Sequence, residues 1–380
     1  MVNKDKKDLT LLERYGLWYI KRLSKKHPLD RVDLKTHILD DEERTQINKI
    51  EKRAIINVTI AGVLSSIVSG LAGFYADPLI DESANFLSKT NLWYWSIVIG
   101  VTIIASTIEI FYIYYDMMAK THALTKAAHL KLFDFEKDID DIAISIVRAA
   151  LELPNKKDSD INIDPKRESS KLVVFLAMAL YKLKISVSNF LLKALVKRMM
   201  GRALSRAWLN FLAIPVCAFW NGIVCWFVIR EVKIRVLGPS VANEILGKLD
   251  ESDIELSESG KLVLHMAIGS CIVRTADLHP NLEYLYRSIN AKVEEPLGAI
   301  LDDSELFLIE LGKLEPQEQD LMLHILVFAA IIDGKINFRE RKLLKAAYEV
   351  CNIHFNYTQI KKFLTDFRAG RLIEFELEKK

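Results

Sequence analysis

The sequence predicts an all-α membrane protein with a transmembrane helical hairpin, a further membrane-embedded or re-entrant segment, and a C-terminal soluble helical bundle. Three observations predict this fold. Residues 54–76 form a run of 23 positions without a charge, and a second apolar run covers 91–115. About 20 apolar residues span a bilayer as a helix. Residues 207–229 form a third apolar run, again of 23 positions without a charge, and 261–380 show the pattern of amphipathic helices. Because charged residues are 27% of the chain and mean hydropathy is only +0.13, most of the protein should face water.

The N-terminal region, 1–53, is basic and precedes the hairpin. It carries 14 Lys and Arg residues, whereas the loop 77–90 carries Lys89 alone. The positive-inside rule therefore predicts a cytoplasmic N-terminus. Residues 8–26 form an amphipathic pattern that suits a membrane surface, a partner helix or packing on the protein itself. The acidic residues at 40–43 predict a helix start from which one helix runs unbroken into the membrane.

The hairpin, 54–116, has a small-residue face and buried polar groups. Gly62, Ser66 and Gly70 recur every four residues, which lets two helices approach closely. The second span is the expected partner, with a second protomer as the alternative. Glu109 should lie at the depth of Asn57 and Thr59, and we expect it to face one of them. It would then handle a proton or an ion, or simply extend to the nearby interface.

The middle of the chain leaves the number of membrane crossings open. Residues 117–206 read as a cytoplasmic helical region ending in a basic interfacial helix. Basic residues flank 207–229 on both sides, so both of its ends look cytoplasmic. A re-entrant hairpin bent near Pro215 or Asn221-Gly222 would explain this, as would an additional crossing by 172–192. A plain span that leaves the C-terminal part outside is the third and less favoured possibility. Residues 230–260 are then a linker.

The C-terminal domain, 261–380, contains two similar helix–turn–helix segments. In the second segment an apolar helix is followed by a turn at Asp333-Gly334, and Asn337 and Glu340 form a predicted capping box. In the first, Leu264-His265 corresponds to Leu323-His324 and Glu283 corresponds to Glu340, a repeat of about 57–59 residues. Two such units predict a compact helical bundle.

The turn of the second segment resembles the signature of TerB-like domains, which are named for tellurite-resistance proteins. Residues 328–344, FAAIIDGKINFRERKLL, match a pattern of an apolar helix, an A-D-G-x-I-x-x-x-E turn and a second helix, with Ile332 where Ala is usual. The resemblance covers about 261–376 and implies a role in stress-response or membrane-associated assemblies. It also implies a divalent metal at Asp333 and Glu340, and less directly at Asp277 and Glu283. The alternative is a capped turn that binds no metal.

The chain shows no catalytic motif and no cofactor motif, and its net charge of +2 gives no case for nucleic-acid binding. We therefore expect a non-enzymatic, multi-pass protein of the bacterial inner membrane. Its N-terminus and TerB-like domain would be cytoplasmic, and that domain would act as a scaffold or sensor in envelope or metal stress. The alternative is an oligomeric channel or transporter subunit. The expected partners are the lipid bilayer and a protein partner or a second copy of the chain.

Overall fold

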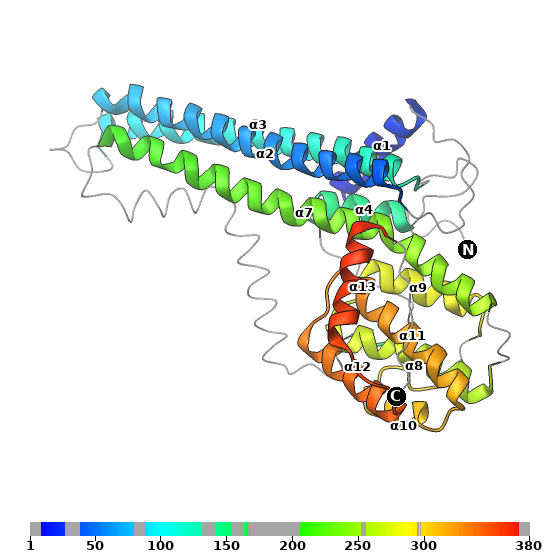
Figure 1. The fold of residues 1–380 in the computed structure, drawn as a ribbon. Helices are drawn as coiled ribbons and strands as arrows, with labels where there is room; N and C mark the ends of the chain where they lie inside the picture. The colour runs from blue at the N-terminus through cyan, green and yellow to red at the C-terminus, as the bar shows by residue number, and fades with distance from the viewer. Residues whose placement is uncertain are drawn as a thin grey trace. The chain divides into compact units, whose positions relative to one another are not determined.

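The fold is all-α, as predicted. The computed structural model describes residues 9–26, 39–79, 88–130, 141–153, 161, 163–165, 167, 206–251, 256–294, 296 and 298–371. These residues form helices and connecting turns and contain no strand (Figure 1). The chain divides into two compact units. Unit 1 comprises Met1–Ile47, His122–Val174 and Glu231–Lys380, and unit 2 comprises Asn48–Thr121 and Phe175–Arg230.

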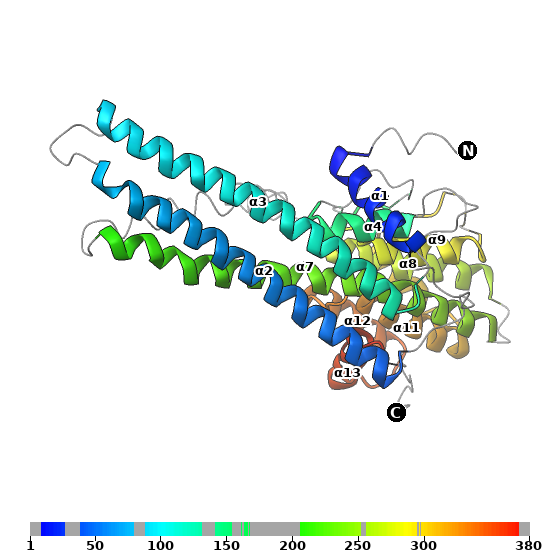
Figure 2. The same ribbon diagram turned by 90° about the horizontal axis from the view of Figure 1, so that it is seen from above.

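Unit 2 is built from parts of three long helices, α2 (Asp41–Ala76), α3 (Lys89–Ala127) and α7 (Arg206–Glu251). Figures 1 and 2 show these helices side by side. Three helical segments are long and apolar enough to cross a membrane, namely Asp41–Leu79, Asn91–Ala127 and Ile214–Gly247. These lengths and compositions are consistent with a membrane protein.

Helix α2 begins where its acidic start is predicted. The backbone amide of Glu43 donates to Asp40 Oδ1 over 2.7 Å, and the amide of Asp40 donates to Glu43 Oε2 over 2.9 Å. These reciprocal bonds satisfy two amides that have no partner within the helix. From there α2 continues for 36 residues to Ala76, so the prediction of an unbroken helix is confirmed.

Helix α7 differs from the predicted re-entrant hairpin and from the predicted linker. It continues for 46 residues through both Pro215 and Asn221-Gly222, so neither position bends the chain back. A broken helix in hydrocarbon would expose unpaired backbone groups, which is a strong reason for a helix to tolerate an internal proline. Residues 230–251 belong to the same helix. The predicted basic helix at 171–206 and the predicted crossing at 172–192 lie outside the described residues, apart from Arg206.

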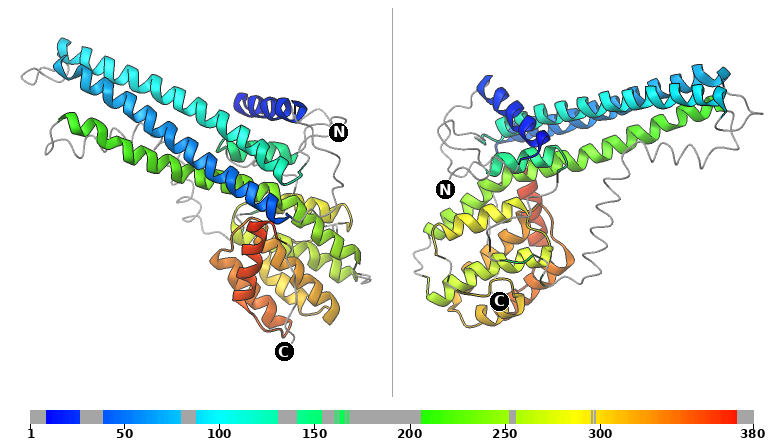
Figure 3. Two further views of the ribbon diagram at one scale, coloured as in Figure 1. Left: turned by 45° about the horizontal axis from the view of Figure 1, so that its top comes forward. Right: turned by 180° about the vertical axis from the view of Figure 1, so that it is seen from behind.

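Unit 1 contains the C-terminal bundle, in which the apolar helices α8 (Glu258–Thr275) and α11 (Pro316–Ile331) contact each other. Around them lie α9 (Pro280–Asn290), α10 (Ser304–Leu311), α12 (Phe338–Val350) and α13 (Tyr357–Ala369), which Figure 3 shows in yellow to red. Most residues of α8 are buried, as expected for a helix that is apolar on most of its faces. The same compact unit also contains α1 (Leu11–Lys26) and α4 (Asp141–Ala150).

Helix α1 packs on α4 through one face and exposes another. Leu17 and Ile20 are buried, and Arg148 Nε lies 3.1 Å from Glu13 Oε1. Tyr15 and Trp18 remain half exposed. Packing on its own protein therefore accounts for one face of this amphipathic helix, and its aromatic face stays accessible.

The two helix pairs α8–α9 and α11–α12 confirm the repeat and correct its register. Each turn contains one left-handed residue, Ala276 with φ 57° and Gly334 with φ 76°. The N-caps are His279 and Asn337. The steps from 276 to 334 and from 279 to 337 are both 58 residues, and the same step from Glu340 leads to Leu282. Glu283 is therefore not the equivalent of Glu340.

Candidate functional site

Two groups of buried polar residues are candidates for a functional site, one in each unit. The first is the transmembrane polar cluster, which we define as Asn57, Glu109, Asp116 and Asn221. At its centre Asn221 Nδ2 of α7 donates to Glu109 Oε1 of α3 over 2.6 Å, and both side chains are only 4% exposed. The predicted partners of Glu109 were Asn57 and Thr59 of the first span. The hydrogen bond in the structure instead comes from α7.

Asn57 bonds to a carboxylate that the sequence analysis did not select. Its Nδ2 donates to Asp116 Oδ1 over 3.0 Å, and Lys120 Nζ lies 3.4 Å from the same oxygen. Asp116 directly follows Tyr114 and Tyr115 at the end of the second apolar run and is 7% exposed. Its position beside these aromatic residues was the available signal. It could have indicated Asp116 as a second membrane carboxylate.

The small-residue face packs inside the chain, but against a different helix from the one predicted. A Cβ atom on Gly62 would collide with the amide nitrogen of Asn221 and would lie 3.3 Å from the carbonyl oxygen of Cys217, both in α7. Ser66 and Gly70 are also buried. Close approach at Gly62 is therefore confirmed, and its partner is α7.

The transmembrane polar cluster can perform two kinds of chemistry. Carboxyl groups buried among membrane helices bind a proton or a cation, or they fasten helices together through hydrogen bonds. The cluster contains buried carboxyl groups and also interhelical hydrogen bonds, because Glu109 and Asp116 each accept an amide hydrogen from a residue on another helix. Ser65 and Ser66 add buried hydroxyl groups, whose Oγ atoms have no hydrogen-bond partner within the described part of the chain.

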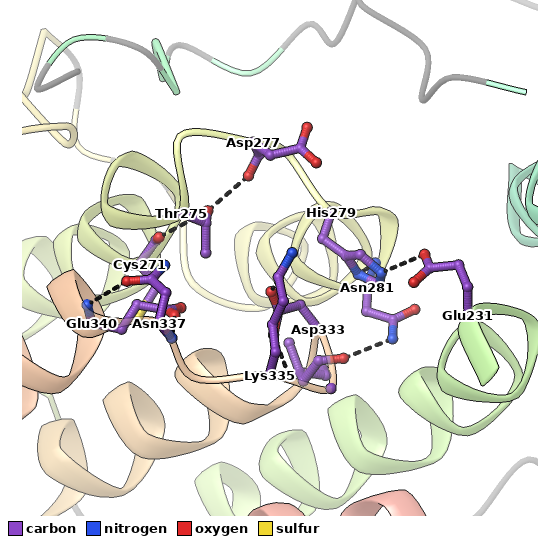
Figure 4. Close-up of polar contacts among 12 residues, drawn as sticks. Glu231, Cys271, Thr275, Asp277, His279, Asn281, Asp333, Lys335, Asn337 and Glu340 are labelled. Carbon is purple, nitrogen blue, oxygen red and sulfur yellow. Dashed lines mark hydrogen bonds and ion pairs between the residues drawn. The ribbon is translucent and has the colours of Figure 1, made fainter. Parts of the chain in front are cut away.

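The second candidate is the acidic turn of Asp333 and Glu340, which Figure 4 shows between α11 and α12. The predicted capping box is present: Glu340 N donates to Asn337 Oδ1 over 2.9 Å, and Asn337 N donates to Glu340 Oε2 over 2.8 Å. Asp333 Oδ1 accepts the amide of Lys335 over 2.9 Å. One oxygen of each carboxyl group therefore accepts a backbone amide of its own turn, whereas Glu340 Oε1 is buried without a hydrogen-bond partner among the described residues.

Burial changes the acidity of this turn. Burial, and secondarily the nearby Asp333 carboxylate, raise the pKa of Glu340 to about 9. Burial also raises the pKa of Asp333, while His279 and Lys335 oppose that change. The pKa of the Cys271 thiol is raised too, because it is buried and lies close to both carboxyl groups. Glu340 is therefore a neutral carboxylic acid at pH 7.

The structure does not assemble a metal cluster here from the residues it describes. Among them, no group of three or more His, Cys, Asp and Glu side chains could hold a metal ion. Asp277 is exposed, and Glu283 accepts a bond from Arg287 over 2.8 Å, so neither is a ligand beside the turn. His265 is fully buried, and its Nδ1 lies 2.8 Å from the carbonyl oxygen of Lys261. The capped-turn interpretation accounts for the bonds of Asp333 and Glu340.

Two residues that the sequence analysis did not select, His279 and Asn281, connect α7 to the helix pairs α8–α9 and α11–α12 through polar contacts. Asn281 Nδ2 donates to the carbonyl oxygens of Ile234 over 2.9 Å and Ile332 over 2.8 Å. His279 Nε2 lies 3.1 Å from Glu231 Oε1 of α7. The Asn281 amide also fills the space where Gly238 would otherwise carry a Cβ atom. Figure 4 shows His279 and Asn281 with Glu231 of α7 beside them.

Comparisons of the chain with protein-family models, with curated proteins and with solved structures gave no match. The resemblance of residues 328–344 to TerB-like domains therefore stays a prediction.

Proposed function

We propose that this protein is a non-enzymatic sensor of the bacterial inner membrane, in which a membrane-embedded helix bundle controls a helical unit outside the bilayer. One observation carries this proposal. Helices α2, α3 and α7 each pass without a break from unit 2 into unit 1. A rigid helix transmits a shift at one end to the residues at its other end. A change in the transmembrane polar cluster can therefore reach the helical unit through three continuous helices.

The experiment compares hydrogen exchange of the full-length protein in lipid nanodiscs with that of the Glu109→Leu variant. Loss of the Asn221–Glu109 bond should change the exchange of peptides from α8 to α12. The matched control is Ile108→Leu, because Ile108 is the adjacent residue and is 64% exposed. If Glu109→Leu changes exchange only within the candidate spans, the sensor proposal is wrong.

The composition of unit 1 supports a cytoplasmic location for both ends of the chain. The unit combines Met1–Ile47, His122–Val174 and Glu231–Lys380, so we place these segments on one side of the bilayer. The basic N-terminal region makes that side the cytoplasm. Since α7 is one continuous helix, we favour the alternative with four spans, in which the additional crossing falls at 172–192, outside the described residues. Reporters fused after residues 160 and 250 should be cytoplasmic, and one fused after residue 205 should be external.

The TerB-like resemblance supports a role in envelope or metal stress, with the helical unit as the scaffold for a protein partner. A strain that lacks the protein should grow normally in rich medium and poorly under tellurite or membrane stress. Equal growth of the two strains under both stresses would count against this role.

A second candidate function, as a channel or transporter subunit, is favoured by the buried Glu109–Asn221 pair. The predicted oligomer face at Gly62 lies against α7 of the same chain. A pore would therefore need a different surface. Proton and sodium flux into proteoliposomes, measured for the wild type and Glu109→Gln, tests this candidate. Flux that depends on Glu109 would favour a transporter over a sensor.

A further inference from the structure

A shallow groove of about 340 Å³ is lined by residues of α2 and α7. Ile55 and Thr59 of α2 form one wall, and Phe219, Ile223 and Trp226 of α7 form the other, with Gly222 between them. Phe219 is 70% exposed and Trp226 is 43% exposed. The groove lies within two of the candidate spans, so it would open towards lipid chains.

The two helices run in opposite directions along this groove, and their register identifies its basic end. A Cβ atom on Gly222 would lie 2.9 Å from Thr59 Oγ1, so these residues are level with each other. Two helical turns towards the start of α2 lead from Thr59 to Lys52, on the same face. Just over two turns towards the end of α7 lead from Gly222 to Arg230. Lys52 and Arg230 therefore lie at the same end of the groove.

The basic end coincides with the boundary of the apolar surface. The uncharged run of α2 starts at residue 54, and that of α7 ends at residue 229. The guanidinium of Arg230 lies 5.3 Å from the centre of the Trp226 ring, an arrangement that suits the interface between hydrocarbon and headgroups. The acidic residues next to them in the sequence are Glu51 and Glu231, and Glu231 is paired with Arg235 and His279.

We infer that the groove binds one acyl chain of an anionic phospholipid, and that Lys52 and Arg230 hold its headgroup phosphate. An apolar groove alone would accept any lipid of the annulus. Two basic residues at its interfacial end add selectivity for a negative headgroup, since such pockets between membrane helices attract anionic lipids. Arg230 can form paired hydrogen bonds to phosphate oxygens. This site is separate from the Glu109–Asn221 bond and does not depend on the sensor proposal.

The test uses the full-length protein in nanodiscs that contain equal amounts of phosphatidylglycerol and phosphatidylcholine, followed by native mass spectrometry of the lipids it retains. The wild type should retain phosphatidylglycerol preferentially. Arg230→Gln and Lys52→Gln should each lower that preference about fivefold, as expected for the loss of one basic contact. Arg53→Gln is the matched control, because it removes the same charge from a position about 100° around α2 from Lys52, farther from the groove.

A second variant tests the groove itself. Ala218 also lines it, so Ala218→Phe should fill the space and reduce retention of both lipids. The inference is overturned if the wild type shows no preference, if Arg53→Gln has the same effect as Arg230→Gln, or if Ala218→Phe retains as much lipid as the wild type. Circular dichroism of each variant confirms that its helices are intact.

Discussion

Glu109 and Glu340 are both buried glutamates, but the two regions of the molecule hold them in different ways. Glu340 accepts the backbone amide of Asn337, three residues away in the same turn. Glu109 accepts a side-chain amide from Asn221, 112 residues away on another helix. The first carboxyl group is positioned as soon as α12 forms, whereas the second needs α3 and α7 to pack.

The Glu340 bonds stabilise one turn, whereas the Glu109 bond links two helices. A capped turn keeps its bonds when neighbouring helices move. An interhelical bond breaks when one helix rotates or slides, so it reports on the relative position of two helices. If the protein is a sensor as proposed, a signal would start in the transmembrane polar cluster, and the acidic turn would stabilise the helical bundle of unit 1.

The largest expected effect comes from Gly62→Ala. The added methyl group would collide with the Asn221 amide, so we expect a loss of about 2–3 kcal/mol in the free energy of unfolding. Detergent or SDS titration of the purified full-length protein measures it. Gly100→Ala is the matched control, since a Cβ atom there meets nothing within 4 Å among the described residues. Equal effects of the two variants would show that α7 does not pack closely on Gly62.

The second prediction concerns the pH dependence of the acidic turn. Below about pH 4.5 Glu340 is protonated in both the folded and the unfolded state. Between pH 4.5 and 9 only the unfolded state loses the proton, because the pKa in the folded protein is about 9. The free energy of unfolding of the wild type should therefore fall as pH rises through this range.

Glu340→Gln should remove part of that fall while it keeps the capping box. We expect the variant to be more stable than the wild type by about 1–2 kcal/mol at pH 8 and nearly equal to it at pH 4. Thermal unfolding across this pH range measures the difference. A difference that does not change with pH would mean that Glu340 is not a neutral acid in the folded protein.

A double-mutant cycle measures the strength of the bond between Glu109 and Asn221. Glu109→Leu and Asn221→Leu should each destabilise the protein, and the double variant should cost less than the sum by about 1 kcal/mol. The cycle is measured in the same SDS titration. Asn57→Leu combined with Asn221→Leu serves as the control, since each amide bonds to a different carboxylate. Purely additive effects of Glu109→Leu and Asn221→Leu would contradict a direct bond.

The smallest expected effect is that of Glu283→Gln. Its bonds are to Arg287 on the surface of α9, so the change should cost less than about 0.5 kcal/mol. Unfolding of the full-length protein, compared with Glu340→Gln at the same pH, measures it. A large effect would restore Glu283 as the functional equivalent of Glu340.

Features that depend on contacts within a few residues are predicted from the sequence, and contacts between distant helices are not. The starts of α2 and α12 are predicted correctly, because both depend on carboxylates three residues from an N-cap. The Glu109–Asn221 bond is missed because the sequence does not reveal which helix packs on α3. The repeat is displaced by one residue at Glu283 because its left-handed turn residue is Ala276, which carries no glycine signal.

The sequence pattern also did not predict that α7 continues as one unbroken helix. Pro215, Asn221 and Gly222 are all helix-weakening residues. Together they favoured a bend in the prediction. The free-energy cost of unpaired backbone groups in hydrocarbon is larger than the helix-weakening effect of these residues, so the helix stays unbroken. The three apolar runs were sufficient to predict where the long apolar helices lie, although not that the third run is one continuous helix.

The Asn281 side chain has a consequence for how α7 can move. Its amide bonds to one carbonyl of α7 and occupies the space above Gly238 one turn later. Sliding α7 by a single residue, about 1.5 Å, would break this bond and bring a neighbouring side chain of α7 against the amide. Asn281 therefore opposes sliding of α7 past the start of α9, and the two helices are expected to move together.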